Sequence, residues 1–217
     1  MSHSDSTGSA APLGKKLLAE HFRADAIARE ATVARFMSRV SSLFIVSTLG
    51  LTPLIGWPRA LSVASLCAFY AVYYGVLSRR LRRGWFHPAI YWVNVGLETT
   101  TGAFLFVCDS LFGTPEQALG NPMAVLWTAA IVFAALRGKR SLALFAGGLV
   151  AAQTVLLYFL LAWPRLAEPV PLMYSPPMVL LRAAYYVVIG WLAALVAGYL
   201  TQRAEKALHA VREKELV

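Results

Sequence analysis

The stretch from Val179 to Val217 constrains the fold more than any other part of the chain. Its first part, VLLRAAYYVVIGWLAALVAGYL, is apolar with Arg182 as its one charge. That length is enough to cross a bilayer, which takes about 20 residues for a hydrocarbon core of roughly 30 Å. The second part, QRAEKALHAVREKELV, is charged and favours a helix. The pattern indicates a membrane helix that continues into a polar cytoplasmic helix.

Five more apolar segments precede this one, and none shows the alternation typical of a strand. The chain is 58% hydrophobic and 14% charged, whereas about a quarter of the residues of a typical soluble domain are charged. We therefore predict an all-α polytopic membrane protein, a bundle of six transmembrane helices within 40–201. The expected spans are 40–57, 60–77, 88–108, 120–136, 141–163 and 179–201. The flanking segments are predicted to be a disordered N-terminus (1–13), a cytoplasmic juxtamembrane helix (14–39) and the start of a cytoplasmic signalling helix (202–217).

The positions of Lys and Arg predict the orientation. With six spans they all fall on one face of the membrane except Arg59, Arg165 and Arg182. By the positive-inside rule, both termini are expected to be cytoplasmic. The net charge of +9 is then explained by topology and by contact with anionic lipid, so we expect no nucleic-acid partner.

Enzyme signatures do not occur in the sequence. It contains no HExxH, no Gly-rich phosphate loop, no CxxC pair and no GxSxG elbow. The two cysteines, Cys67 and Cys108, lie in apolar segments and are expected to act as small apolar residues. We expect no catalytic residue, metal or cofactor in this chain.

The most informative polar residue is Glu98, near the middle of the third predicted span. Asn94 lies one turn earlier on the same helix face. A carboxyl group at this depth is costly and is either protonated or paired. Gln153 lies at a similar depth in the fifth span, and Arg182 can either extend outward or reach towards Glu98. The group can be a structural contact between helices, a ligand-sensing or proton-sensing site, or an ion-translocating carboxylate.

The last span carries a ridge of small residues, Gly190, Ala194 and Gly198. Such ridges let helices approach closely, either within one bundle or between the subunits of a dimer. The tail that follows places Leu208 and Val211 at a spacing that can begin a coiled coil, with Arg203 at its start. We expect these residues to carry the output signal, in a homodimer.

Three features give the chain a resemblance to a known family. They are the acidic residue in NVGLETT, the stretch ALRGKRSLALFAGGLVAA, and a last span that leads into a charged helix. The layout resembles the six-helix N-terminal membrane modules of bacterial class III adenylate and guanylate cyclases. Similar modules precede some bacterial serine/threonine kinases. The resemblance covers about 40–217. It implies a receptor or regulator in the bacterial cytoplasmic membrane, whose catalytic residues lie in a following soluble domain.

The sequence therefore predicts a membrane sensor and anchor module of a bacterial signalling receptor. The last helix would relay the signal to a nucleotide-cyclase output domain, which we expect beyond Val217. One alternative is the membrane region of a serine/threonine or histidine kinase. Another is a small stand-alone transporter that uses Glu98, although a second polar half-site is not found. A membrane enzyme acting on lipid is disfavoured by the lack of paired His, Asp or Glu at the basic interface.

Overall fold

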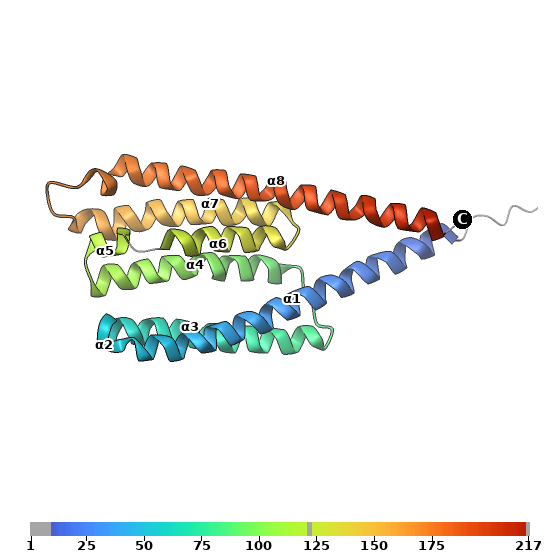
Figure 1. Cartoon of the computed structure of the whole chain (residues 1–217), viewed down its shortest axis with the longest axis horizontal. Coiled ribbons are helices and arrows are strands. Elements are labelled where there is room, and N and C mark those ends of the chain that lie inside the picture. The colour runs from blue at the N-terminus through green and yellow to red at the C-terminus, as the bar shows by residue number, and fades with distance from the viewer. Residues whose placement is uncertain (1–9, 121–122, 216–217) are drawn as a thin grey trace, which may run out of the picture. The chain divides into compact units, whose positions relative to one another are not determined.

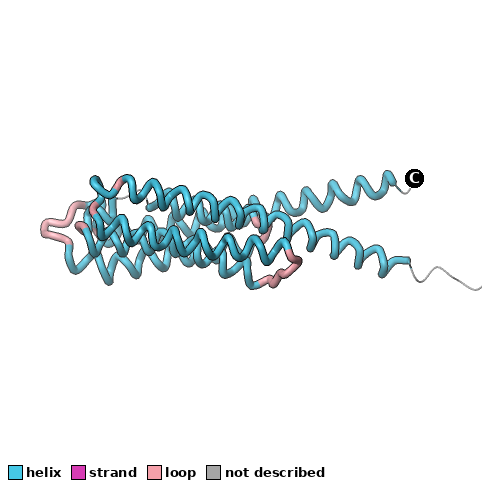
Figure 2. Tube along the Cα trace, turned by 90° about the horizontal axis from the view of Figure 1, so that it is seen from below, coloured by secondary structure: helices cyan, strands magenta, loops and turns pink. Residues whose placement is uncertain are grey.

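The computed structural model describes residues 10–120 and 123–215, and these ranges form helices joined by loops, without a strand (Figures 1 and 2). The all-α prediction is confirmed for this part of the chain. The α-helices are α1 (Ala10–Gly50), α2 (Thr52–Ile55), α3 (Trp57–Arg82), α4 (Ala89–Phe112), α5 (Pro115–Gly120), α6 (Met123–Leu136), α7 (Arg140–Leu157) and α8 (Pro176–Glu215). A π-helical turn (Tyr158–Ala162) and two 3-10 turns (Trp163–Arg165 and Leu172–Tyr174) lie between α7 and α8.

Within the described residues, four helical stretches are long and apolar enough to cross a membrane. They are Trp57–Arg82, Ala89–Phe112, Arg140–Arg165 and Pro176–Ala204. The predicted spans at 40–57 and 120–136 are not among them. Helix α6 has 14 residues, which extend about 21 Å, and the apolar end of α1 stops at Gly50.

The chain divides into two compact units, Met1–His87 and Pro88–Val217. In unit 1, α1 packs against α3. The Ser38 hydroxyl donates to the Ala71 carbonyl (2.8 Å) and lies beside Gly75, which brings the middle of the two helices into contact. Helix α1 begins at Ala10, inside the segment predicted to be disordered.

The basic segment after the second predicted span is helical rather than a loop. Helix α3 continues through Arg82, and Leu77, Ser78 and Leu81 are buried. These residues share one helix face, so the basic side chains between them lie on the other faces. The helix ends just before Gly84, whose φ of 81° suits glycine.

Unit 2 is an up-and-down arrangement of α4, α6, α7 and α8. Trp92 meets Phe145 edge-on, and Gln153 donates to the Thr100 hydroxyl, so α4 and α7 run parallel. Gly147 faces Gly190 and Gly138 meets Thr201, so α8 runs antiparallel to α7. We call the two ends of this unit the Tyr91 end and the Phe106 end, after residues near the two ends of α4.

Side-chain size in α8 follows a membrane pattern. Its bundle-facing positions include the small residues Ala183, Ala194 and Ala197, which are buried, whereas Trp191 and Leu195 are about half exposed. Large exposed apolar residues are unfavourable in water but suit contact with lipid, and small residues allow helices to approach. This distribution agrees with a bilayer environment.

The end of α7 is widened into a π turn. Pro164 has no N–H group, and its ring crowds the carbonyl four residues earlier, so a regular helix cannot pass through it. The π turn at Tyr158–Ala162 lets the chain reach this proline without a break. Tyr158 is fully buried there, and its hydroxyl donates to the Tyr174 carbonyl (2.7 Å), which holds the following loop.

Candidate functional site

A buried ion pair joins α4 to the turn between α6 and α7. Arg137 donates through Nη1 to Glu98 Oε2 (2.8 Å) and through Nη2 to Glu98 Oε1 (2.6 Å). The two side chains are only 6% and 7% exposed. A bidentate pair of this kind is strong and directional, and it neutralises a carboxylate that would otherwise be costly among apolar helices.

The turn that carries Arg137 also holds α8. Gly138 adopts φ 74°, a conformation that other residues rarely reach, and its carbonyl accepts a hydrogen bond from the Thr201 hydroxyl (3.1 Å). The Arg140 side chain lies directly over Gly198, where any side chain would collide with it. On the α4 side, Lys139 lies 4.5 Å from the centre of the Tyr91 ring, a cation–π contact. We call Glu98, Arg137, Gly138 and Thr201 the coupling joint.

Two of the predicted partners of Glu98 have other partners. Gln153 donates to the Thr100 hydroxyl (3.3 Å). Arg182 donates to the carbonyl of Leu119 and to that of Met173, both at 3.2 Å. Glu98 is thus paired with Arg137 rather than with Gln153, and Arg182 extends towards Leu119 and Met173 rather than towards Glu98. Asn94 is fully buried on α4, one turn from Glu98.

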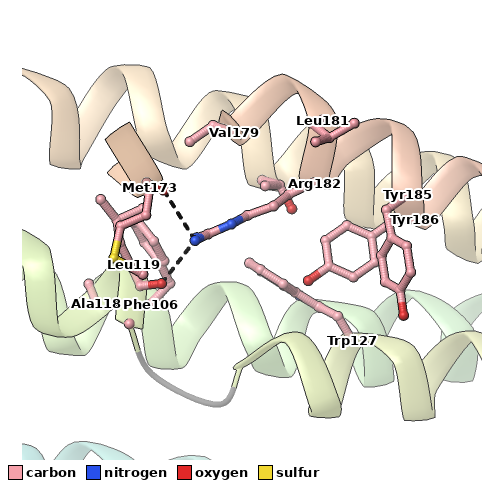
Figure 3. A pocket seen from close by; sticks show the side chains of 12 residues that line it. Phe106, Ala118, Leu119, Trp127, Met173, Val179, Leu181, Arg182, Tyr185 and Tyr186 are labelled. Carbon is pink, nitrogen blue, oxygen red and sulfur yellow. Dashed lines mark hydrogen bonds between the residues drawn. The ribbon is translucent and has the colours of Figure 1, made fainter. Parts of the chain in front are cut away.

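Arg182 belongs to a separate cleft at the Phe106 end of unit 2 (Figure 3). The cleft has a volume of about 420 Å³ and is lined from α4, α5, α6, α7, α8 and the turn at Met173. Leu181 and Tyr185 are 61% and 53% exposed, so its α8 rim lies at the surface of the unit.

Aromatic side chains form the inner wall of the cleft. Trp127 packs edge-on against Tyr186, with ring centroids 5.7 Å apart, and its indole N–H donates to the Thr99 carbonyl (3.1 Å). Gly102 leaves the space that the indole ring occupies. Figure 3 shows the Arg182 guanidinium directed towards Leu119 and Met173, away from these rings.

The small-residue ridge of α8 packs within the chain. A Cβ atom at Gly190 would lie 2.9 Å from the Gly147 Cα atom, and Gly198 lies beneath Arg140. Ala194 packs with Ala135 and Ala143 in a buried cluster. The ridge therefore serves contact with α7 and the α6–α7 turn.

The predicted output residues lie on the continuous helix α8. Arg203 is exposed, two residues after Thr201. Leu208 and Val211 also lie within the bounds of α8, but their side chains fall outside what the structure describes.

Sequence reasoning identified Glu98 and Arg182 but missed Arg137 and the aromatic wall. The predicted spans 120–136 and 141–163 leave Arg137 in the cytoplasmic loop between them, because it follows the apolar run and starts the basic stretch RGKR. One signal was available: an arginine just after an apolar helix has a side chain long enough to reach back to a buried carboxylate. No local pattern marks Trp127 and Tyr186 as neighbours, because they are far apart in sequence.

No family model, no curated protein and no solved structure matches this chain.

Proposed function

We propose that this chain is the membrane sensor and anchor module of a bacterial signalling receptor, with α8 as its output helix. The observation that carries the proposal is the coupling joint. Arg137 is held by Glu98, and the next residue, Gly138, is hydrogen-bonded to Thr201 on α8. Beyond Thr201 the same helix continues as the charged tail to Glu215.

The relay works through two packings of unit 2. A change at the cleft alters the position of α8, which carries Arg182 and Tyr186 in its first part and Thr201 further along, just before the charged tail. The joint holds α8 in one of these packings. A stimulus drives the change only if it binds the two packings with different affinities.

The proposed topology has six spans in the bacterial cytoplasmic membrane, with both termini cytoplasmic. Arg137, Lys139 and Arg140 lie at the Tyr91 end, as do Thr201 and the start of the tail. Placing this end on the cytoplasmic side satisfies the positive-inside rule. The cleft at the Phe106 end then faces the outer side.

The proposed output is a nucleotide-cyclase or kinase domain connected to the tail. In the proposed homodimer, a surface other than the small-residue ridge makes the contact, because α7 and Arg140 already cover that ridge.

A transporter based on Glu98 is less well supported. A carboxylate that binds and releases protons in turn needs a site that changes its partner, whereas Glu98 makes two short bonds to one arginine. That geometry suits a fixed contact between helices better than a carboxylate that carries protons.

The relay is tested by a distance measurement across unit 2. Spin labels are placed at Ser141→Cys on α7 and Gln202→Cys on α8, both exposed positions, after Cys67 and Cys108 are replaced by alanine. Pulsed electron paramagnetic resonance in nanodiscs then reports the distance distribution. We expect Arg137→Gln to shift or broaden it, because the turn that holds Thr201 loses its anchor. The charge swap Glu98→Arg with Arg137→Glu should restore it.

Arg165→Gln is the matched control, because Arg165 donates to the Ser110 carbonyl at the Phe106 end, far along α4 from Glu98. It should leave the distribution unchanged. An unchanged distribution in a folded Arg137→Gln variant would rule out the joint as a relay.

A further inference from the structure

We propose that the cleft at Arg182 binds an anionic amphiphile, a molecule with one carboxylate or phosphate headgroup and an apolar chain. The inference rests on the proposed function, since it names the kind of signal that the sensor module would receive. It is argued from the charge, the donor geometry and the walls of the cleft.

The charge of Arg182 is the first argument. Its two hydrogen bonds go to the carbonyls of Leu119 and Met173, which are neutral groups. Within the described residues no carboxylate is paired with it. A cation among apolar helices favours an anion beside it, and this cleft leaves a place for one.

The donor geometry is the second argument. A guanidinium group has five N–H donors in a planar fork, so two bonds to carbonyls leave donors for a ligand. This fork matches the paired oxygens of a carboxylate or phosphate. Because the carbonyls hold the fork in place, a ligand headgroup would meet an ordered cation (Figure 3).

The walls of the cleft indicate that the rest of the ligand is apolar. Beyond Arg182 they are mainly apolar or aromatic, with Phe106, Trp127, Val179 and Tyr186 among them. A volume of about 420 Å³ lies within the range of roughly 300–1,000 Å³ that is usual for small-ligand sites. With its α8 rim exposed, the cleft allows an apolar chain to continue into surrounding lipid.

Binding at this place would act directly on the output helix. Val179, Arg182 and Tyr186 all belong to α8, the helix that Thr201 connects to the coupling joint. Occupancy at one end of α8 would therefore favour the packing of unit 2 that accommodates the ligand.

The test measures equilibrium binding of radiolabelled dodecanoate to the whole chain in phosphatidylcholine nanodiscs, with empty nanodiscs subtracted. We expect saturable binding of one dodecanoate per chain. Dodecan-1-ol and dodecyltrimethylammonium should compete at least about tenfold more weakly, because they cannot form charge-assisted bonds with Arg182. Equal competition by dodecan-1-ol, or no saturable binding, would overturn the proposal without any variant.

Substitutions of Arg182 and Arg165 test whether dodecanoate binds in the cleft. Arg182→Met should weaken dodecanoate binding at least about tenfold, and Arg182→Lys less, since lysine keeps the charge but loses the fork. Arg165→Met is the matched control, because Arg165 also donates to a carbonyl at the Phe106 end but does not line the cleft. Wild-type affinity in Arg182→Met, or an equal loss in Arg165→Met, would contradict the assignment.

Two further comparisons distinguish a membrane lipid from a free acid as the ligand, and this inference from the proposed function. If phosphatidylglycerol nanodiscs suppress dodecanoate binding, a membrane lipid headgroup is the ligand; if not, it is a free single-chain acid. Either result supports an anionic amphiphile. If dodecanoate binds saturably but does not change the distance between the labels at positions 141 and 202, and Arg137→Gln does not change it either, the proposed function alone is refuted. If Arg137→Gln changes that distance but no dodecanoate binds, this inference alone is refuted.

Discussion

Glu98 and Arg137 form a buried ion pair, so removing either side chain leaves the other charge buried without its bidentate partner. Glu98→Ala would leave Arg137 buried and uncompensated, and we expect the free energy of unfolding to fall by about 3 kcal/mol. Replacing both residues, Glu98→Leu with Arg137→Met, removes both charges, so the loss should be far smaller. Chemical denaturation in detergent, followed by circular dichroism, measures both variants against the wild-type chain. A loss in the double variant as large as that in Glu98→Ala would contradict the pairing.

Gly102 tests the aromatic wall at the residue scale. A Cβ atom there would lie 2.7 Å from Trp127 Cδ1, so Gly102→Ala must displace the indole ring and its bond to Thr99. We expect a destabilisation of about 1–3 kcal/mol, measured as a lower melting temperature.

Gly96→Ala is the control for this substitution, because Gly96 lies on the same helix and its Cβ would meet no atom within 4 Å. It should be neutral or slightly stabilising, since alanine favours a helix. Equal effects of the two substitutions would show that the indole is not the cause.

At the scale of single residues, the sequence predicts features that are rare in their segment or that depend only on nearby residues. Glu98 is recognisable because it is a lone carboxylate in an apolar span, and Asn94 follows from helix periodicity. Arg137 is not recognisable as its partner, because hydropathy ends the span at Leu136 and cannot show a side chain that reaches back. Which cation pairs with a carboxylate is decided by tertiary distance.

At the scale of elements, the contact between α7 and α8 depends on two glycines. A Cβ atom at Gly147 would lie 2.8 Å from the Tyr186 carbonyl oxygen and 2.9 Å from the Gly190 Cα atom. Gly147→Ala should therefore force the helices apart and lower stability by about 1–3 kcal/mol. Its neighbour Gly148 has open space, so Gly148→Ala is the matched control. Thermal unfolding in detergent measures both, and similar melting temperatures would contradict the close approach.

The bounds of the helices show where hydropathy misleads. It ended the second span at Leu77, whereas α3 continues to Arg82, because Ser78 and Leu81 are buried and no proline or glycine intervenes. The expected continuation of the last span into the charged tail agrees with α8, which is one helix from Pro176 to Glu215. A change in polarity predicts where a chain leaves the lipid. The helix itself ends where its backbone hydrogen bonds end, which can be at a different residue.

At the scale of the whole molecule, the path of the chain within unit 2 limits the possible topologies. Helices α4 and α7 are parallel neighbours, so the segment between them must return the chain to the Tyr91 end. Helices α5 and α6 make this return, although α6 alone is shorter than a usual span. This path supports the proposed fourth crossing.

Labelling with a membrane-impermeant maleimide tests the topology. After removal of Cys67 and Cys108, Glu168→Cys should react in intact bacterial cells, because its loop lies at the Phe106 end, between the 3-10 turns Trp163–Arg165 and Leu172–Tyr174. Gln202→Cys, at the Tyr91 end, should react only after permeabilisation. Both positions are exposed, so access to the reagent depends on the side of the membrane. The opposite pattern would reverse the proposed orientation, and labelling of both in intact cells would contradict it.

The whole-molecule features were the least predictable. The membrane class follows from composition and segment length alone. The cleft does not, since it is made where residues of α4, α5, α6, α7, α8 and the turn at Met173 meet. Such a space depends on how helices of unequal length pack, which no short window of sequence contains.

The close contact of Gly147 with Gly190 also has a mechanical consequence. It places a fulcrum on α8, about 12 Å from Arg182 and about 37 Å from Glu215, given 1.5 Å per residue. Any rocking of a stiff α8 about this point would move its last residues about three times as far as Arg182. A displacement too small to disturb the cleft would then be magnified where the charged tail ends.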